Sequence, residues 1–233
     1  MRLRLAVFAS GGGTNLQALL DSFQNRSDSP IRVVLVVSDQ PQAGALERAR
    51  QANVENVVIP VAGRPADFVA RETLAVLESA DVDLIALAGY LRLIPPVIVK
   101  RYRQRMVNIH PALLPAFGGK GMYGTRVHQA VIDAGCTISG ATVHLVDEQY
   151  DQGRIIAQWP VPVLPNDDPK SLAERVLRVE HMLFPAAVEA LAHDLANDHE
   201  QPRAMQLPVD IGFDLVDDYR VTSAAIRHAL GLG

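Results

Sequence analysis

Polar side chains that could do chemistry gather in one short segment, Asn108-Ile109-His110-Pro111, where an apolar run ends. Residues two positions apart in a strand face the same side, so the Asn108 amide and the His110 imidazole are expected to point together. An amide can donate to a carbonyl oxygen, and an imidazolium beside it can stabilise the oxyanion formed when that carbonyl is attacked. The pair suits acyl or formyl transfer. A satisfied polar pair at a strand end is the structural alternative.

A second polar cluster begins at His144, which ends another apolar run and is followed by the acidic segment 147–153. If Asp151 lies beside His110, it will orient the ring, raise its pKa and keep it protonated. Two alternatives stay open at this point. One is a solvated acidic turn. The other is a metal site made of His144, Asp147 and Asp151, although their spacing matches no recognised motif such as H-E-x-x-H.

A glycine loop, Ser-Gly-Gly-Gly-Thr-Asn at residues 10–15, joins the first apolar run to a helical pattern. Small residues at a helix start let backbone N–H groups bind a phosphate. The loop is not a Walker sequence, and Leu16 occupies the last glycine position of the dinucleotide fingerprint. Asp39 resembles a ribose-binding acid, so a nucleotide cofactor stays open. The structural alternative is a plain turn in which Thr14 or Asn15 caps the helix.

Strands and helices alternate in the first half of the chain. Short apolar runs predict strands at 3–9, 31–38, 57–60, 82–89 and 106–110, and helical spacing predicts helices at 14–23, 43–52, 66–79 and 95–103. Because helices separate strands that are continuously apolar, the strands are expected to be parallel and covered on both faces. The fold class is therefore α/β, an open, doubly wound, mostly parallel sheet with helices on both faces.

The order of elements changes after residue 123. A helix at 124–134 precedes two strands, 140–146 and 154–163, which predict an antiparallel addition to the sheet. A long helix over 169–197 follows, and Pro185 is expected to kink or interrupt it. The prediction is one catalytic domain, residues 1–200, and a C-terminal extension, 201–233, with a final helix near 223–230. Surface packing, an oligomer interface and a loosely ordered tail stay open as roles for the extension.

Composition excludes several classes of protein. The 233 residues are 48% hydrophobic with a net charge of -4, which suits a folded domain and argues against broad electrostatic binding to nucleic acid or to a membrane surface. The lone Cys136 excludes an internal disulfide framework and suits a reducing compartment. No signal-peptide core or membrane-length apolar stretch is present, so a cytoplasmic location is expected.

Several segments together resemble the folate-dependent glycinamide ribonucleotide formyltransferase family. They occur in the family's order over about residues 3–195: the glycine loop with Asn15, Leu-Glu-Arg-Ala-Arg at 46–50, Leu-Ala-Gly-Tyr-Leu-Arg at 87–92, Asn-Ile-His-Pro-Ala-Leu-Leu-Pro at 108–115, Gly-Ala-Thr-Val-His at 140–144, and 147–153. The segment at 108–115 alone indicates a folate-dependent formyl transferase or hydrolase. The glycine loop with Asn15 narrows the resemblance to the ribonucleotide branch.

The resemblance implies transfer of a formyl group from 10-formyltetrahydrofolate, as co-substrate, to the amine of glycinamide ribonucleotide in de novo purine synthesis. It makes Asn108, His110 and Asp151 the catalytic group, with His144 as a supporting residue. No metal is expected, nor a nucleic-acid or membrane partner. The protein is expected to be a monomer or a homodimer.

The resemblance also implies two sets of binding residues. The ribonucleotide set is Gly13, Thr14, Asn15 and Glu180. The folate set is Arg64, Leu91, Arg92, Leu93, Ile94, Asn108, Asp147, Glu148 and Asp151. For Arg92 a purely structural or surface role stays open. The glycine-rich loop 116–124 departs from the family pattern; it is expected to be a lid, with Lys120 either near phosphate or solvated.

Other functions share parts of this sequence pattern. In this family the hydrolase branch carries an N-terminal regulatory domain and the methionyl-tRNA branch a basic C-terminal domain, and neither pattern is expected here. A non-catalytic nucleotide or folate binder is the alternative from another class. The combination of Asn108, His110 and Asp151 argues against it, because a pure binder needs no imidazole paired with an acid.

Overall fold

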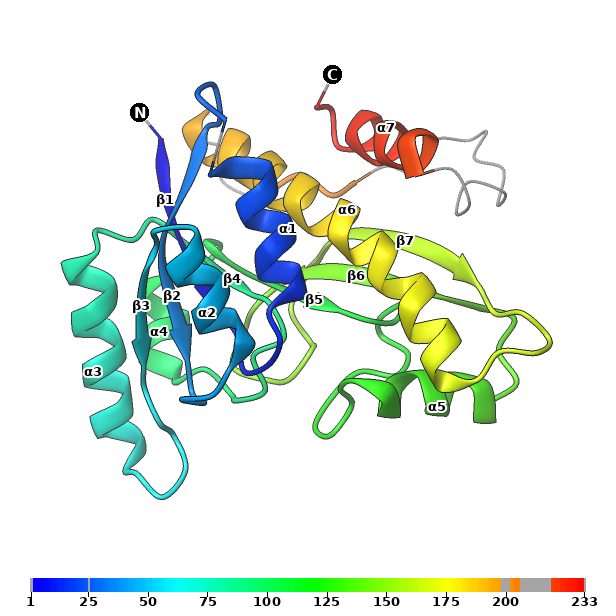
Figure 1. The fold of residues 1–233 in the computed structure, drawn as a ribbon, viewed down its shortest axis with the longest axis horizontal. Coiled ribbons are helices and arrows are strands. Elements are labelled where there is room, and N and C mark those ends of the chain that lie inside the picture. The colour runs from blue at the N-terminus through cyan, green and yellow to red at the C-terminus, as the bar shows by residue number, and fades with distance from the viewer. Residues whose placement is uncertain (1, 25, 198–201, 206–218, 233) are drawn as a thin grey trace. The chain divides into compact units, whose positions relative to one another are not determined.

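The computed structural model describes residues 2–24, 26–197, 202–205 and 219–232, drawn in colour in Figure 1. The chain forms two compact units. The first comprises Met1–Asn108 and Val146–Gln149, and the second comprises Ile109–Leu145 and Tyr150–Gly233. Of the predicted extension 201–233, residues 201, 206–218 and 233 lie outside the described residues.

Parallel strands form the sheet of the first unit. They are β1 (Leu3–Phe8), β2 (Ile31–Ser38), β3 (Glu55–Val58), β4 (Leu84–Leu87) and β5 (Met106–His110), whose last two residues belong to the second unit. Their order is β3-β2-β1-β4-β5, so the order along the sheet reverses beside β1. The residues of β1 from Leu5 onward are almost completely buried, as expected for a central strand covered on both faces.

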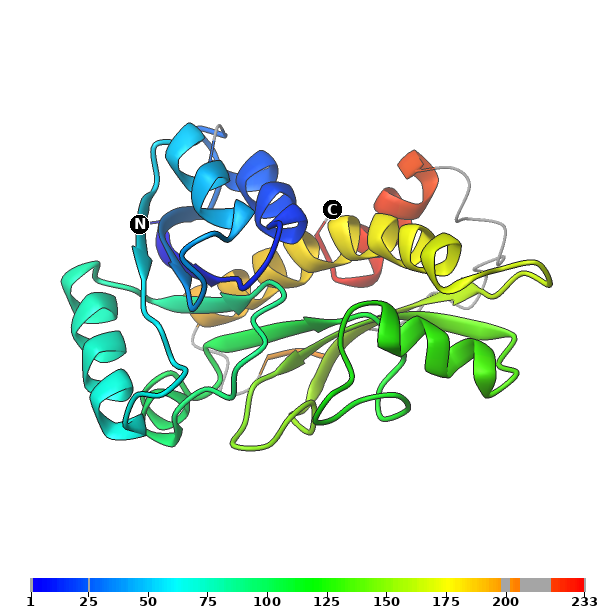
Figure 2. The same ribbon diagram turned by 60° about the horizontal axis from the view of Figure 1, so that its bottom comes forward.

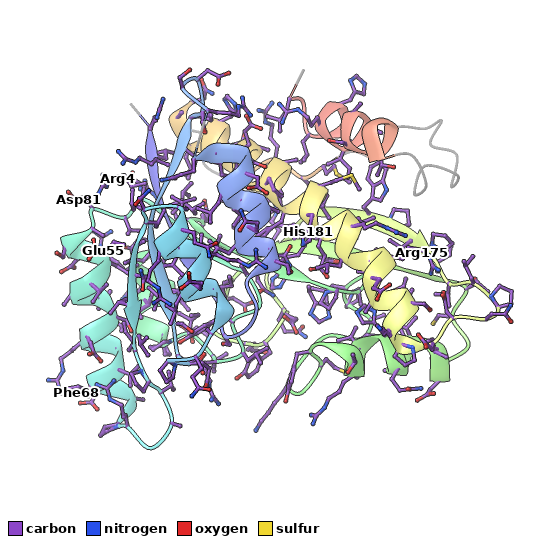
Figure 3. All side chains as sticks on the ribbon, in the orientation of Figure 1. Arg4, Glu55, Phe68, Asp81, Arg175 and His181 are labelled. Carbon is purple, nitrogen blue, oxygen red and sulfur yellow. The ribbon has the colours of Figure 1, made fainter. Side chains whose placement is uncertain are left out.

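Four helices cover this sheet: α1 (Thr14–Phe23), α2 (Gly44–Gln51), α3 (Ala66–Ser79) and α4 (Pro96–Arg101). Figure 2 shows α1 and α2 on one face and α3 and α4 on the other. On α1 the buried residues Leu16, Leu19, Leu20 and Phe23 recur at helical spacing and form the stripe that packs on the sheet. By contrast, Phe68 projects outward from α3, as labelled in Figure 3.

The second unit contains β6 (Ile138–Leu145), β7 (Ile155–Pro162), α5 (Thr125–Asp133), α6 (Pro169–Ala196) and α7 (Tyr219–Ala229). Strands β6 and β7 pair antiparallel, with Ala141 opposite Trp159, and α6 packs on both. In β6 a Cβ on Gly140 would lie 2.3 Å from the Trp159 carbonyl oxygen, so the pairing needs glycine there. The complete strand order is β3-β2-β1-β4-β5-β6-β7. The predicted fold class, mostly parallel with an antiparallel addition, is confirmed.

Helix α6 runs without a break through Pro185, so the predicted interruption is wrong. A proline inside a helix costs about 3 kcal/mol. Burial offsets this, because Leu183, Phe184 and Ala187 around the proline are fully buried. A capping box stabilises the start of the helix. The Asp168 side chain accepts from the Ser171 backbone N–H, and the Ser171 hydroxyl accepts from the Asp168 N–H.

The described parts of the C-terminal extension pack within the second unit. Arg203 donates to the Asp194 carboxylate from its backbone N and from Nε, each at 2.7 Å. The backbone N–H of Met205 donates to the Ile156 carbonyl of β7 at 2.7 Å. In α7, Ile226 is fully buried. Of the three roles left open for the extension, surface packing describes these residues.

Candidate active site

His110, at the end of β5, is almost completely buried. Its Nε2 lies 2.8 Å from the Phe117 carbonyl oxygen, and since a carbonyl only accepts, Nε2 carries a proton. The other ring nitrogen, Nδ1, lies 3.6 Å from Oδ2 of Asp151. Asn108 is two residues earlier on the same strand and is half-buried. Because residues i and i+2 of a strand share a face, both side chains belong to the same face of β5.

Asp151 lies between two histidines. Its Oδ1 is 3.5 Å from Nε2 of His144, and its Oδ2 accepts from the backbone N–H of Gly119 at 2.8 Å. The Nδ1 of His144 lies 2.8 Å from the Leu145 carbonyl oxygen, so this nitrogen is also a donor. The structure thus brings His110, His144 and Asp151 together, as the sequence predicted.

The pKa values of the pair differ from the sequence expectation. Burial lowers the pKa of His110, and this outweighs the Asp151 charge and the Phe117 carbonyl, which raise it. For Asp151, burial raises the pKa, but hydrogen bonds from His144 and Gly119 and the nearby imidazoles outweigh it, so the net pKa is lowered. The free protein therefore holds a charged Asp151 beside a His110 that gives up its proton more easily than an ordinary histidine. The expectation of a raised His110 pKa is wrong, because desolvation is the larger effect.

Close packing fixes the loops that carry these groups. Asp151 itself has φ +56°, a left-handed conformation that costs a non-glycine residue roughly 1–3 kcal/mol. Two residues later, a Cβ on Gly153 would lie 1.7 Å from the Leu145 carbonyl oxygen. A Cβ on Gly118 would lie 2.5 Å from Leu114 Cδ2 and 3.2 Å from Asp151 Cβ. Glycine is therefore required at position 153, where the clash would be with backbone, whereas a Cβ at position 118 would displace the Leu114 side chain.

The glycine loop of the first unit is shaped to leave backbone N–H groups accessible. Gly13 is the N-cap of α1 with φ +74°, and a Cβ there would lie 2.7 Å from Ala45 Cα. Gly11 and Gly12 are exposed, while the Gly12 carbonyl accepts from Arg48 Nε at 2.8 Å. Among the described residues no side chain caps α1, so the alternative in which Thr14 or Asn15 caps it is wrong. The positive end of α1 suits an anion.

The segment after β4 is tied to the first residue of that loop. The backbone N–H of Leu91 donates to the Ser10 hydroxyl at 3.0 Å, and Arg92 Nε donates to Asp39 Oδ2 at 2.8 Å. Leu91 and Leu93 are exposed, and Ile94 is buried. Because the Asp39 side chain is only 1% exposed, it is not placed to bind a ribose, which removes the support for a dinucleotide cofactor.

The remaining residues predicted to bind a ligand differ in their exposure and in their polar partners. Arg64 pairs with Glu72 at 2.7 Å and stacks over the Phe68 ring at 4.8 Å. Asp147 Oδ1 accepts from the Gln149 backbone N–H at 2.9 Å. Glu148 and Lys120 are exposed, and Glu180 is buried on α6. For Lys120 this agrees with the solvated alternative.

Two negative findings apply to the described ranges, residues 2–24, 26–197, 202–205 and 219–232. Within them no group of three or more His, Cys, Asp or Glu side chains is placed to hold a metal ion. Within them also, no helix has the length and apolar character needed to cross a bilayer.

The sequence profile described as "Formyl transferase" matches residues 3–188 of the chain. The chain belongs to the formyl transferase family. This confirms the family resemblance drawn from the segments at 10–15, 108–115 and 140–153.

Individual relatives of this formyl transferase carry more specific names than the family does. It is 46% identical over 197 residues to "Phosphoribosylglycinamide formyltransferase, chloroplastic" of Arabidopsis thaliana, covering 83% of this chain and 66% of that protein. The corresponding Vigna unguiculata protein is 43% identical over 83% of this chain and 62% of its own length. The chain thus spans less than two thirds of either plant relative. A solved structure titled glycinamide ribonucleotide transformylase 1, from Geobacillus kaustophilus, is 44% identical, with a TM-score of 0.75 and coverage of 82% of this chain and 100% of that one.

Three residues of this formyl transferase that touch the site region were missed from sequence. Thr142 Oγ1 donates to the Ala112 carbonyl at 2.6 Å and accepts from the Leu114 N–H at 3.1 Å, and Gln158 Nε2 donates to the Leu114 carbonyl at 2.9 Å. They hold the backbone that follows His110. His128, on α5, is buried, and burial followed by the His110 charge lowers its pKa to about 4. The inward-facing period of β6 could have indicated Thr142; nothing in the sequence marked the other two.

Proposed function

We propose that this formyl transferase moves the formyl group of 10-formyltetrahydrofolate onto the amine of glycinamide ribonucleotide, as in de novo purine synthesis. The observation that carries the proposal is the buried contact of His110 with Asp151, at the end of a strand that also bears Asn108. Relatives named phosphoribosylglycinamide formyltransferase, similar over more than four fifths of this chain, support the same substrate pair.

In this mechanism the formyl oxygen takes the place of the Phe117 carbonyl as acceptor for Nε2 of His110. The ribonucleotide amine attacks the formyl carbon, and the C=O electron pair moves onto oxygen. Asn108 and His110 donate to this oxyanion. As negative charge develops on oxygen, the imidazole takes up a second proton from solvent and returns it when the intermediate collapses, and Asp151 stabilises this transient cation from the Nδ1 side. His144, on the other carboxylate oxygen, keeps Asp151 charged and oriented.

Collapse of the tetrahedral intermediate completes the transfer. The amine nitrogen loses a proton, the departing N10 of the folate gains one, and the bond between N10 and the formyl carbon breaks. A water molecule or a substrate group carries that proton from one nitrogen to the other. The products are the N-formyl ribonucleotide and tetrahydrofolate, so atoms and charges balance without a metal or a redox partner.

Ribonucleotide binding is assigned to the glycine loop and α6. The phosphate accepts from backbone N–H groups at Gly13, Thr14 and Asn15, where the dipole of α1 favours an anion. Glu180 contacts the ribose and amine region. Its burial suits a carboxylate that binds ligand hydroxyl or amine groups in place of water.

Folate binding is assigned to the segment after β4 and to the acidic loop. The pterin binds largely to backbone groups at Leu91, Arg92, Leu93 and Ile94, together with Asn108. Additional contacts come from Asp147, Glu148, Asp151 and, from the segment before α3, Arg64.

The decisive experiment follows tetrahydrofolate release from 10-formyltetrahydrofolate with and without glycinamide ribonucleotide. We expect release to need the ribonucleotide and one formylated ribonucleotide to appear for each tetrahydrofolate. Release that proceeds equally without the amine would reject the transferase and favour a hydrolase. Binding of both ligands with no turnover under any condition would favour the non-catalytic binder.

The wider setting of the enzyme is also part of the proposal. We assign catalysis to residues 1–200 and treat 201–233 as an extension. The protein is placed in the cytoplasm as a monomer or homodimer without a nucleic-acid or membrane partner; the plant relatives, by contrast, are named chloroplastic. Cell fractionation and light scattering of the purified protein test location and oligomeric state.

A further inference from the structure

Asp39 is a buried carboxylate of the first unit that the proposed chemistry does not use. It follows β2 directly, and its side chain is 1% exposed. Oδ2 accepts from Arg92 Nε at 2.8 Å and from Gln40 Nε2 at 2.8 Å. The nearby Ser10 hydroxyl helps to lower the pKa of the carboxyl, while Oδ1 has no hydrogen-bond partner in the part of the chain that the structure describes. Burying an ionised carboxylate is costly unless it is paired and hydrogen-bonded. Its partners therefore explain why it stays charged.

The partners Ser10 and Arg92 of Asp39 belong to two different segments, each of which is assigned to ligand binding. Ser10 opens the glycine loop after β1, and Arg92 lies in the segment after β4. The Ser10 hydroxyl also accepts from the Leu91 N–H at 3.0 Å, and the Ser10 N–H donates to the Gly89 carbonyl at 3.1 Å. Because β2, β1 and β4 are consecutive in the sheet, their carboxyl ends meet where the strand order reverses, the usual place for ligands in such sheets.

Electrostatics agree with a charged Asp39. Burial raises the pKa of Asp39, but hydrogen bonds from Ser10, Arg92 and Gln40 outweigh it and leave the pKa below its ordinary value. Burial followed by the Asp39 charge raises the pKa of Tyr90. Arg92 keeps its charge at any working pH, so this pair persists wherever the enzyme is active.

We propose that Asp39 is a positioning residue for folate binding: it holds the Arg92 guanidinium and, through Ser10, the backbone at Leu91 in the geometry that the folate requires. The inference rests on the proposed function, since it concerns the affinity for that co-substrate. Asp39 touches neither the formyl group nor the amine. Its loss should therefore weaken folate binding and leave the chemical step intact.

The first test compares steady-state constants of the full chain with those of Asp39→Asn, which keeps the side-chain size and removes the charge. We expect the KM for 10-formyltetrahydrofolate to rise about tenfold, because the Asn amide can replace only part of the charge-assisted hydrogen bonding. The kcat and the KM for glycinamide ribonucleotide should stay within about twofold. Asp28→Asn, an exposed aspartate paired with Arg26 in the same unit, is the matched control and should leave all three constants unchanged.

The second test asks whether Asp39 acts through Arg92. In a double-mutant cycle, Asp39→Asn should add almost nothing to the folate KM once Arg92→Gln is present, because the group it positions is gone. Additive effects, or a fall in kcat together with a lower melting temperature, would show a merely structural residue and overturn the proposal. A lower folate KM in Asp39→Asn would also overturn it, since Asp39 would then compete with the ligand for Arg92. Formyl transfer by the wild-type protein is the control for these tests. If the wild-type protein did not transfer the formyl group, the proposed function itself would fail, whatever the variants did.

Discussion

Asp39 and Asp151 are both largely buried aspartates, but they are surrounded by different kinds of partner. Asp39, in the first unit, pairs with Arg92, whose charge does not titrate in the physiological range. Asp151, in the second unit, faces two imidazoles, His110 at 3.6 Å and His144 at 3.5 Å, and burial lowers the pKa of His110. The distances also differ, since Arg92 Nε approaches Asp39 to 2.8 Å.

The difference separates two tasks. A short contact with a permanent cation fixes geometry and responds little to pH. A longer contact with the His110 ring leaves room for a proton and for charge that appears only during a reaction. We therefore expect changes at Asp39 to affect ligand affinity, and changes at Asp151 to affect the rate of the chemical step.

The largest effect should follow Asp151→Asn. The amide keeps the shape but cannot stabilise an imidazolium at His110, so kcat should fall at least about a hundredfold, or roughly 2.7 kcal/mol in barrier height. The KM for glycinamide ribonucleotide should change little. His110→Ala should cost at least as much. Single-turnover kinetics with both substrates bound measures this directly.

The double variant Asp151→Asn/His110→Ala supplies the control. Two residues that act as a unit lose little more together than singly. A double variant that multiplies the two losses would mean that they act independently, and a wild-type rate in either single variant would remove that residue from the mechanism.

A second effect should appear in the pH dependence of stability in the second unit. The pKa of His128 is about 4 in the folded protein against an ordinary 6.5, so only the unfolded chain takes up its proton as pH falls below 6.5. Stability is therefore complete above pH 6.5 and is lost progressively toward pH 4. Between about pH 6.5 and pH 5 the loss should be about 2 kcal/mol of unfolding free energy.

Urea unfolding of wild type and His128→Gln at several pH values tests this prediction. The variant should be less sensitive to acid over that window, while His193→Gln, on the exposed side of α6, should behave as wild type. Parallel curves for wild type and His128→Gln would contradict the assignment. Hydrogen exchange at α2, in the first unit, should stay constant over the same window.

The bounds of two strands were predicted correctly from the sequence for a physical reason. Parallel strands buried on both faces are continuously apolar, so β2 and β5 were located to the residue. Pro185 misled the prediction because local propensity opposes a helix there, while tertiary burial, invisible in sequence, supports it. The packing of the extension depends on buried acids of α6, which no local pattern reveals.

For the site, strand periodicity and the family resemblance placed His110 and Asp151 together, but not their pKa balance. The sign of the His110 shift depends on how much water the fold removes around the ring, and that is a three-dimensional quantity. Likewise Asp39 resembled a ribose ligand until the structure placed Arg92 on it. Sequence patterns do not predict which polar groups will pair when they lie far apart along the chain.

The smallest effect should come from a third carboxylate, Glu189 of α6, which pairs with Arg227 of α7 at 2.7 Å. Like Asp39 it is buried beside an arginine, but neither partner belongs to a ligand segment. Arg227 is 37% exposed, so Arg227→Met should lower the unfolding free energy by only about 1 kcal/mol and leave kcat and both KM values unchanged. Removing both charges in Glu189→Gln/Arg227→Met should recover part of that loss. A rise in the folate KM of Arg227→Met, like the rise expected for Asp39→Asn, would contradict this prediction. It would mean that removing the arginine partner of any buried carboxylate weakens folate binding. The distinction between a positioning pair and a structural pair would then fail.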